Sequence, residues 1–246
     1  MVRQKDSRRG PDSTRCGKTG NPKRNGMETS RHLRTAWKLF AASPILYLLM
    51  GAALAYGSLF TLGLLAGPLI GGFVNVGLVH HRTGRPPGFA DLTSAVQNLG
   101  NLLLLSLLFL ISWAGIGVVL PVLMAILWWA YIPLFILLAA LATWWMHVPV
   151  LIVDQRKSLW GAMGASRARV TADGGFLPHL GFLVCIFLLP PTLIFGLSRA
   201  FPSSYLLHFI VCPIQFLALA SAYEDDFGNK PDAMNFLGDT ERGTFR

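Results

Sequence analysis

Few residues of this chain could carry out chemistry, and their spacing brings no recognisable set together. Cys16, Cys185 and Cys212 are too far apart for a C-x-x-C motif, so they indicate neither a zinc site nor a disulfide framework. His179 and His208 are single histidines near the ends of apolar stretches, without a partner at metal-ligand spacing. We therefore expect no metal ion and no cofactor.

The other histidines lie beside charged or aromatic residues. His147 precedes Asp154 by seven positions, about 10 Å of helical rise, and Trp144 and Trp145 lie next to it. This pattern is typical of residues that anchor a helix at the membrane interface, so anchoring is expected in place of proton transfer. The pair His80-His81 adjoins Arg82 and predicts a solvated helix end.

Enzyme signatures are missing from the sequence. It contains no G-x-x-x-x-G-K-[ST], H-E-x-x-H or G-x-S-x-G motif. Asp91, Asp154 and Asp173 lie at the boundaries of apolar stretches and do not make a catalytic carboxylate pair. Asp154 is expected to cap or flank the helix that follows it. These observations predict that the protein is not an enzyme.

One set of small and polar residues recurs at helical spacing. Gly67, Gly71 and Asn75 follow one another at four-residue steps, so they share one face of a helix. Small residues at this spacing let two helix backbones approach closely, and Asn75 could hydrogen-bond to the neighbouring helix. The face is therefore a candidate for helix packing or, alternatively, for lining a cavity.

The elements that carry these residues are apolar and long. Of the 246 residues 53% are hydrophobic and only 13% are charged, and the mean hydropathy is +0.50. Soluble domains carry about twice that fraction of charge. Asp, Glu, Lys and Arg are absent from four stretches, each long enough to cross a bilayer: 39–81, 92–153, 174–198 and 200–223. An all-α, polytopic transmembrane helix bundle follows, with soluble enzymes excluded.

The lengths of these stretches predict about six spans. Inside the first stretch a turn at Gly57-Ser58 is favoured, with Gly63 or Gly67-Pro68 as alternatives. Inside the second we expect a break near Pro121, which gives spans near 102–119 and 123–150. Two further spans are expected at 176–198 and 204–223. With both termini in the cytoplasm, 20 of the 21 basic residues lie on the inner side and only Arg199 lies outside. This asymmetry favours the plasma (inner) membrane and both termini cytoplasmic.

Three regions are expected along the chain. Residues 1–29 form a disordered basic cytoplasmic tail, 30–223 the six-helix transmembrane domain, and 224–246 a short cytoplasmic C-terminal tail. The net charge of +9 is concentrated near the N-terminus, which predicts attraction to anionic headgroups of the lipid bilayer and no specific nucleic-acid partner.

Two amphipathic helices are expected at the membrane surface. In the first, Leu33, Trp37 and Phe40 recur at helical spacing beside basic residues. The second lies in the loop 154–173, where one face carries four residues: Leu159, Met163, Ser166 and Val170. Both patterns are typical of helices that lie in the headgroup layer.

Several short motifs between the apolar stretches resemble those of an uncharacterised group of prokaryotic six-span membrane proteins. They include AWKLF before Ser43-Pro44, Gly67-Pro68 with Gly71-Gly72, RTGRP at 82–86, and PVLIVD at 149–154 followed by Ser158, Ala162 and Ser166. Relatives of this domain also occur as the membrane part of some glycerophosphodiester phosphodiesterases. The resemblance implies the six-span fold and no settled activity, and this chain lacks a hydrolase domain.

Three functions remain open from the residues. The first is a non-enzymatic inner-membrane protein that organises the membrane or binds a partner. The second is a transporter or channel for a lipid-like or weakly polar solute, using the face of Gly67, Gly71 and Asn75 and the broken helices near Pro68 and Pro121. A membrane-embedded lipid enzyme is the third, and no acid, base or nucleophile set supports it.

Overall fold

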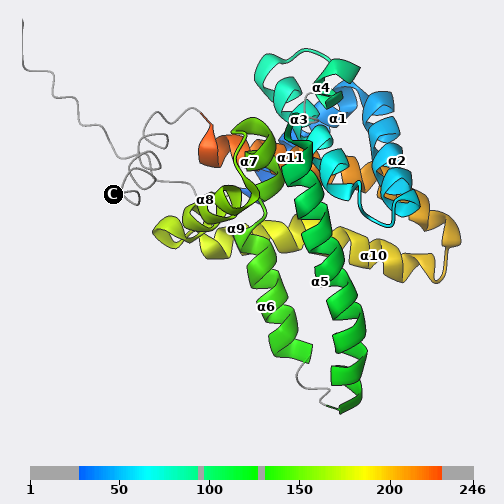
Figure 1. Ribbon diagram of the computed structural model, residues 1–246. Helices are drawn as coiled ribbons and strands as arrows, with labels where there is room; N and C mark the ends of the chain where they lie inside the picture. Colours follow the sequence, from blue (N-terminus) through cyan, green and yellow to red (C-terminus); the bar gives the residue numbers. More distant parts are fainter. Residues whose placement is uncertain (1–27, 94–96, 127–130, 229–246) are drawn as a thin grey trace, which may run out of the picture.

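The protein is entirely helical wherever its structure is described. A computed structural model describes residues 28–93, 97–126 and 131–228, and these ranges contain helices and no strand (Figure 1). The expected all-α class is confirmed. The predicted tail at 1–29 and most of the segment 224–246 lie outside the described residues.

The helices follow one another through short connections. In chain order they are α1 (Thr29–Ala42), α2 (Pro44–Phe60), α3 (Ala66–Thr83), α4 (Phe89–Thr93), α5 (Leu99–Ile126), α6 (Tyr131–Trp144), α7 (Val148–Asp154), α8 (Leu159–Thr171), α9 (Phe176–Leu183), α10 (Leu189–Ser198) and α11 (His208–Phe227). Short 3-10 turns at Ala172–Gly174 and Pro202–Leu207 lead into α9 and α11.

The centre of the molecule is formed by α11 and α3, which pack against each other. α1 lies along α11, α2 contacts both central helices, and α5 and α7 cover α3 (Figure 1). The core holds large apolar side chains from all of these helices: Phe40, Tyr47, Phe73, Leu102, Ile152, Leu217 and Tyr223. The last helix of the described residues thus lies at the centre.

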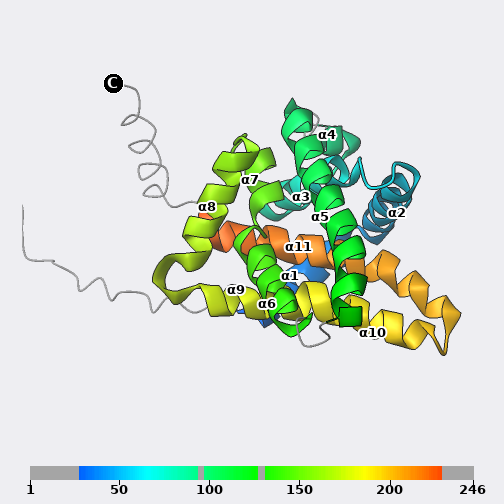
Figure 2. The ribbon, with the colours of Figure 1, turned by 60° about the horizontal axis from the view of Figure 1, so that its bottom comes forward.

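α5 and α6 form a hairpin that projects from the rest of the fold. Figures 1 and 2 show the two helices side by side, crosswise to α10 and α11. α5 continues from Leu99 to Ile126 with Pro121 inside it, so the break expected near Pro121 is wrong. Apolar helices tolerate an internal proline because neighbouring groups satisfy the carbonyl that it frees.

The first apolar stretch bends twice. α1 and α2 meet at 104° across Ser43, where Pro44 begins α2 without an N–H group to bond. The second bend is the turn between Phe60 and Ala66, in which Gly63 has φ +86°. The turn expected at Gly57-Ser58 therefore lies a few residues further on, where glycine supplies the left-handed backbone conformation.

A π-helical turn joins α9 to α10 into one continuous stretch. It covers Val184–Leu188, just before Pro190 and Pro191. The side-chain amide of Gln215 in α11 donates to the carbonyl oxygen of Ile186 at 2.7 Å. A buried glutamine thus bonds to a carbonyl of the widened turn.

Two helical stretches in the described ranges are long and apolar enough to cross a membrane. They are Ile132–Asp154 and Phe176–Ser198, of 23 residues each, and α1 with α2 would add a third as one broken span. The second agrees with the stretch expected at 176–198. These helices indicate a membrane location.

Among the described residues two or three apolar helices are long enough to span a membrane, not the expected six. In α5 the apolar stretch found there is Leu99–Ser112, which is shorter than a span. α3 carries Asn75 and two histidines, and α11 ends in three acidic residues, so both central helices are less apolar than a span requires. Uncharged length alone therefore overcounts the spans, because part of it forms the bends and the protein core.

Helices occupy both segments where amphipathic helices were expected, as α1 and α8. In α8 the predicted face is the buried one, but it packs against α6 and α7 of the protein itself. Ser158 caps this helix by accepting from the amide of Gly161, so the capping role expected for Asp154 is wrong. In α1 the buried residues are His32, Ala36 and Phe40, whereas Leu33 and Trp37 stay exposed.

Candidate functional site

Three successive acidic residues end α11, and each pairs with a different part of the fold. Glu224 accepts from Nε of Arg82 in α3 at 2.5 Å, and Asp225 forms an ion pair with Arg31 of α1. Asp226 faces two histidines and an arginine. Carboxylates are unfavourable at the negative end of a helix dipole, so these basic partners stabilise the helix end.

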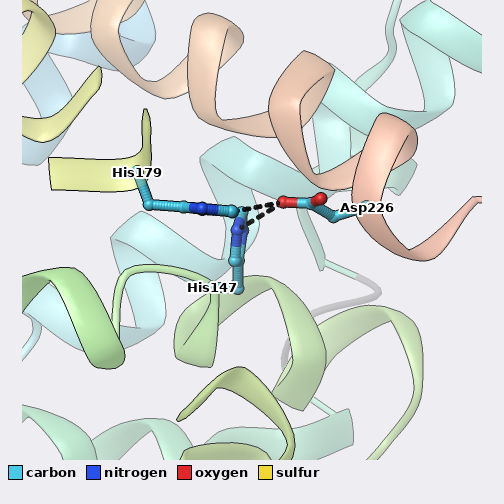
Figure 3. A group of neighbouring side chains, drawn as sticks. All are labelled: His147, His179 and Asp226. Carbon is cyan, nitrogen blue, oxygen red and sulfur yellow. Dashed lines mark hydrogen bonds and ion pairs between the residues drawn. The ribbon is translucent and has the colours of Figure 1, made fainter. Parts of the chain in front are cut away.

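The side chains of His147, His179 and Asp226 converge on one point, and we call them the histidine–aspartate cluster (Figure 3). Nε2 of His179 lies 2.8 Å from Oδ2 of Asp226, and Nε2 of His147 lies 3.1 Å from the same oxygen. His147 comes from the break between α6 and α7, His179 from α9 and Asp226 from α11. Three elements distant in sequence therefore meet at one carboxylate oxygen.

Two groups outside the cluster orient His179 and Asp226. Nδ1 of His179 lies 2.6 Å from the carbonyl oxygen of Gly175, which can only accept, so Nδ1 carries a proton. Nε and Nη2 of Arg169 in α8 donate to Oδ1 of Asp226 at 3.2 and 3.1 Å. Burial alone would raise the pKa of Asp226, but the imidazoles of His147 and His179 beside it hold that pKa well below its usual range.

His147 is wholly buried, with an exposed fraction of 0%. Its ring contacts Phe227 at 5.5 Å and Tyr223 at 6.1 Å between ring centroids, and it meets the ring of His179 edge to face. Neither ring nitrogen of His147 makes a hydrogen bond of acceptable geometry within the described part of the chain. A buried imidazole in this state costs about 1–3 kcal/mol.

The break that presents His147 is held by a serine. Oγ of Ser166 in α8 donates to the carbonyl oxygen of Trp144 at 2.7 Å and accepts from the amide of His147 at 3.4 Å. Both groups belong to the turn where α6 ends and α7 begins, and that turn leaves them outside regular helix bonding. The position of His147 therefore depends on the packing of α8.

A second polar network lies one helical turn away, around Arg82. Its guanidinium binds both carboxylate oxygens of Asp154, at 2.5 and 3.0 Å, as well as Glu224. The hydroxyl of Tyr223 donates to Asp154 at 2.7 Å and accepts from Gln155 at 3.0 Å. The hydrogen bond to Asp154 raises the pKa of Arg82. Burial raises the pKa of Tyr223, and the charge of Asp154 raises it further. This network fixes the ends of α3, α7 and α11 to one another.

The small-residue face of α3 is a packing surface. A Cβ added to Gly67 would lie 2.1 Å from the carbonyl oxygen of Leu102, and one on Gly71 would lie 2.8 Å from the Leu102 side chain. Oγ of Ser106 accepts from the amide of Gly67 at 2.6 Å. Nδ2 of Asn75 donates to the carbonyl oxygen of Asp91 at 2.6 Å. α5 and α4 therefore fill the space beside all three predicted residues.

The histidines are where the predictions and the structure differ most. His147 was expected to reach the interface and His179 to be alone, yet both are buried against Asp226. His80 was expected to be solvated, but it is buried and its Nδ1 bonds to the Tyr47 hydroxyl at 2.7 Å. No local spacing could have shown this, because His147 and Asp226 lie far apart in the sequence.

A shallow hollow opens between α1 and α11. It has a volume of about 390 Å³ and is lined by Ser30, Leu33, Arg34, Trp37 and Ile214. Its lining is mainly apolar, with one guanidinium at the side. None of the residues that line the hollow belongs to the histidine–aspartate cluster.

The comparisons with known proteins identify no relative. No family model matches the chain, no curated protein matches it, and no solved structure matches it. The resemblance to an uncharacterised six-span group stays a prediction. Any functional conclusion must therefore come from the residues themselves.

Proposed function

We propose that this is an integral protein of the plasma (inner) membrane that acts without catalysis, either organising the membrane or binding a partner protein. The proposal rests on the uneven distribution of exposed apolar and charged side chains over the surface of the molecule. Large apolar side chains are exposed along α2, the α5–α6 hairpin and α10, whereas charged groups are gathered and paired at the end of α11. Such a surface suits a bilayer.

The α5–α6 hairpin provides the strongest apolar surface. On α5 and α6, Ile111 and Ile136 each expose 62% of their area. Further exposed apolar residues of the hairpin are Leu104, Leu107, Phe109, Leu110, Val118, Ile132, Phe135 and Leu137. Soluble monomers rarely leave a patch of this size in water, so lipid or an apolar partner surface is the environment that fits it.

α1 supports contact with the headgroup layer. Leu33 and Trp37 are exposed on it, and Arg31 and Arg34 lie on the same helix. Aromatic and basic side chains together favour the boundary between lipid and water, where the basic groups attract anionic headgroups. We therefore propose anionic lipid headgroups as the partner of α1.

The experiment is alkaline extraction of membranes combined with site-specific photo-crosslinking. A photoreactive amino acid at Ile111 or Ile136 should give lipid adducts or one discrete protein adduct, while the same group at Ala168, exposed on α8 between two arginines, should give neither. Release of the protein by alkali, or equal labelling at the three positions, would contradict the proposal.

The side of the membrane on which each terminus lies is open to the same kind of test. Two spans leave the flanking segments on one side, whereas a third span, formed by α1 and α2, would separate them. The basic asymmetry of the sequence favours both termini in the cytoplasm. A reporter fused after Arg246 that is active only outside the cytoplasm would refute that arrangement.

We do not propose a transport function. It depends on an open face at Gly67, Gly71 and Asn75, and that face packs against α5 and α4. No observation within the described residues favours a solute path there.

A further inference from the structure

We propose that His147, His179 and Asp226 form a binding site for one divalent transition-metal ion, of the class that Zn²⁺ represents. One ligand atom from each residue lies within 4.8 Å of the others. Imidazole nitrogen and carboxylate oxygen are ligands that Zn²⁺ and its neighbours accept, and two imidazoles with a carboxylate make a common three-ligand set. The proposal goes beyond the membrane role and is independent of it.

The spacing of the ligand atoms is close to what such an ion needs. At bond lengths of about 2.0–2.2 Å, tetrahedral ligand atoms lie roughly 3.3–3.6 Å apart. The two Nε2 atoms lie 2.8 and 3.1 Å from Oδ2 of Asp226, so an expansion of a few tenths of an ångström would admit the ion. Figure 3 shows both rings directed at this carboxylate from different helices.

The second coordination layer is already in place. Metal-binding histidines usually donate their other N–H to a carbonyl or carboxylate, which fixes the ring and its tautomer. Nδ1 of His179 does this with the carbonyl oxygen of Gly175 at 2.6 Å, so Nε2 is the atom left for the metal. Arg169 holds Oδ1 of Asp226, which leaves Oδ2 as the ligand atom.

His147 supplies an independent reason for a ligand. It is wholly buried, and neither of its ring nitrogens makes a hydrogen bond within the described residues. Its Nε2 nevertheless points to the same place as Nε2 of His179. An ion at this point would give Nε2 of the buried imidazole a coordinate bond, where now it has only the ion-pair contact with Asp226.

The competing interpretation is an ion-pair network in which Asp226 pairs only with Arg169 and the two histidines. The two interpretations differ in a measurable way, because an ion-pair network binds no metal. The full chain in detergent, stripped with a chelator, should bind one Zn²⁺ in a calorimetric titration. Co²⁺ in its place should give the visible absorption of a low-coordinate site. Absence of saturable Zn²⁺ binding would overturn the proposal.

The variants assign the site to its residues. His147→Ala, His179→Ala and Asp226→Asn should each weaken Zn²⁺ binding at least tenfold, since loss of even a second-layer partner has effects of 10–100-fold. The matched controls are His81→Ala, an exposed histidine, and Asp225→Asn, the neighbouring carboxylate, and both should bind as the wild type does. Unchanged binding in the three cluster variants would refute the assignment.

A rescue variant distinguishes loss of metal ligation from loss of folding. In His179→Cys a thiolate replaces one imidazole, and the protein should keep Zn²⁺ binding and give a Co²⁺–thiolate absorption in the near ultraviolet. A cysteine has no place in an ion-pair network with a carboxylate, so this spectrum would support coordination. A His179→Cys protein that melts like the wild type but binds no metal would count against the proposal.

Discussion

At the end of α11 the carboxylates of Glu224 and Asp226 are largely withdrawn from solvent, whereas along the α5–α6 hairpin apolar side chains are left exposed. In the first region Asp226 keeps 13% of its side chain exposed and meets partners from three other elements. In the second, Ile111 and Ile136 are mostly exposed. Stability should depend on the first region and membrane attachment on the second, so substitutions in the two should separate these properties.

The largest effect on stability is expected at Asp226. Asp226→Ala leaves Arg169 and two buried imidazoles without their carboxylate, so the free energy of unfolding should fall by about 3–5 kcal/mol. Asp225→Ala is the control, because the Asp225–Arg31 pair is about half exposed and should contribute less than about 1 kcal/mol. Thermal unfolding in detergent measures both. Equal losses would show that burial does not distinguish the two pairs.

Gly67→Ala tests the point where the hairpin joins the core. The new Cβ would lie 2.1 Å from a backbone oxygen of Leu102, so α3 and α5 must separate, at a cost of about 3 kcal/mol. Gly164→Ala in α8 meets nothing within 4 Å and should gain about 0.5–1 kcal/mol instead. Both values come from unfolding in detergent, and a stable Gly67→Ala protein would exclude the close approach.

Tyr223→Phe removes two hydrogen bonds from the network around Arg82, the one donated to Asp154 and the one accepted from Gln155. The lost bond to the carboxylate of Asp154 should lower the free energy of unfolding by about 1.5 kcal/mol. Tyr56→Phe on the exposed surface of α2 should change it by less than about 0.5 kcal/mol. Chemical unfolding of the two variants side by side gives the comparison, and a neutral Tyr223→Phe would remove Tyr223 from the network.

The pH dependence of stability should carry the signature of Asp226. Its pKa is held below the ordinary value of 3.8, so its contribution is present above about pH 4 and is lost as the pH falls further. His147, His179 and Arg169 face this carboxylate. The stability difference between wild type and Asp226→Asn should shrink below pH 4, by at most about 1.4 kcal/mol per pH unit. A constant difference down to pH 2.5 would contradict this.

The smallest effect on folding is expected in the hairpin. Ile111→Ser combined with Ile136→Ser should change unfolding in detergent by no more than about 0.5 kcal/mol per residue, because both side chains are exposed. The same variant should be extracted from membranes more easily than the wild type, since polar groups are unfavourable in lipid. Ala168→Ser on α8 is the control. A hairpin variant that unfolds readily in detergent but stays in the membrane would show that the hairpin contributes to stability and not to membrane attachment.

The sequence was informative where a local pattern decides the structure. The helical class, the apolar stretch at 176–198 and the buried face of α8 all follow from periodicity and hydropathy. The number of spans was overestimated because the same apolar composition serves both lipid and a protein core. α3 and α11 show this, since nine residues of each are buried in the protein.

The candidate site could not be predicted in the same way. A hydropathy reading ends the last helix at Tyr223 and treats Glu224, Asp225 and Asp226 as part of a tail, but α11 continues through them to Phe227. Their partners come from α1, α3, α8 and α9. Such pairings depend on how helices distant in the chain pack, which periodicity does not encode.

The π-helical turn at Val184–Leu188 sets which way the last third of its helix faces. It holds one residue more than an α-helical turn would. Winding the same residues as a regular α-helix would rotate α10 by about 100° relative to α9, because the wider turn absorbs the rotation of one residue. Ile194, now turned inward, would then swing toward the surface. The orientation of α10 thus depends on the winding of one turn as much as on the side chains that follow it.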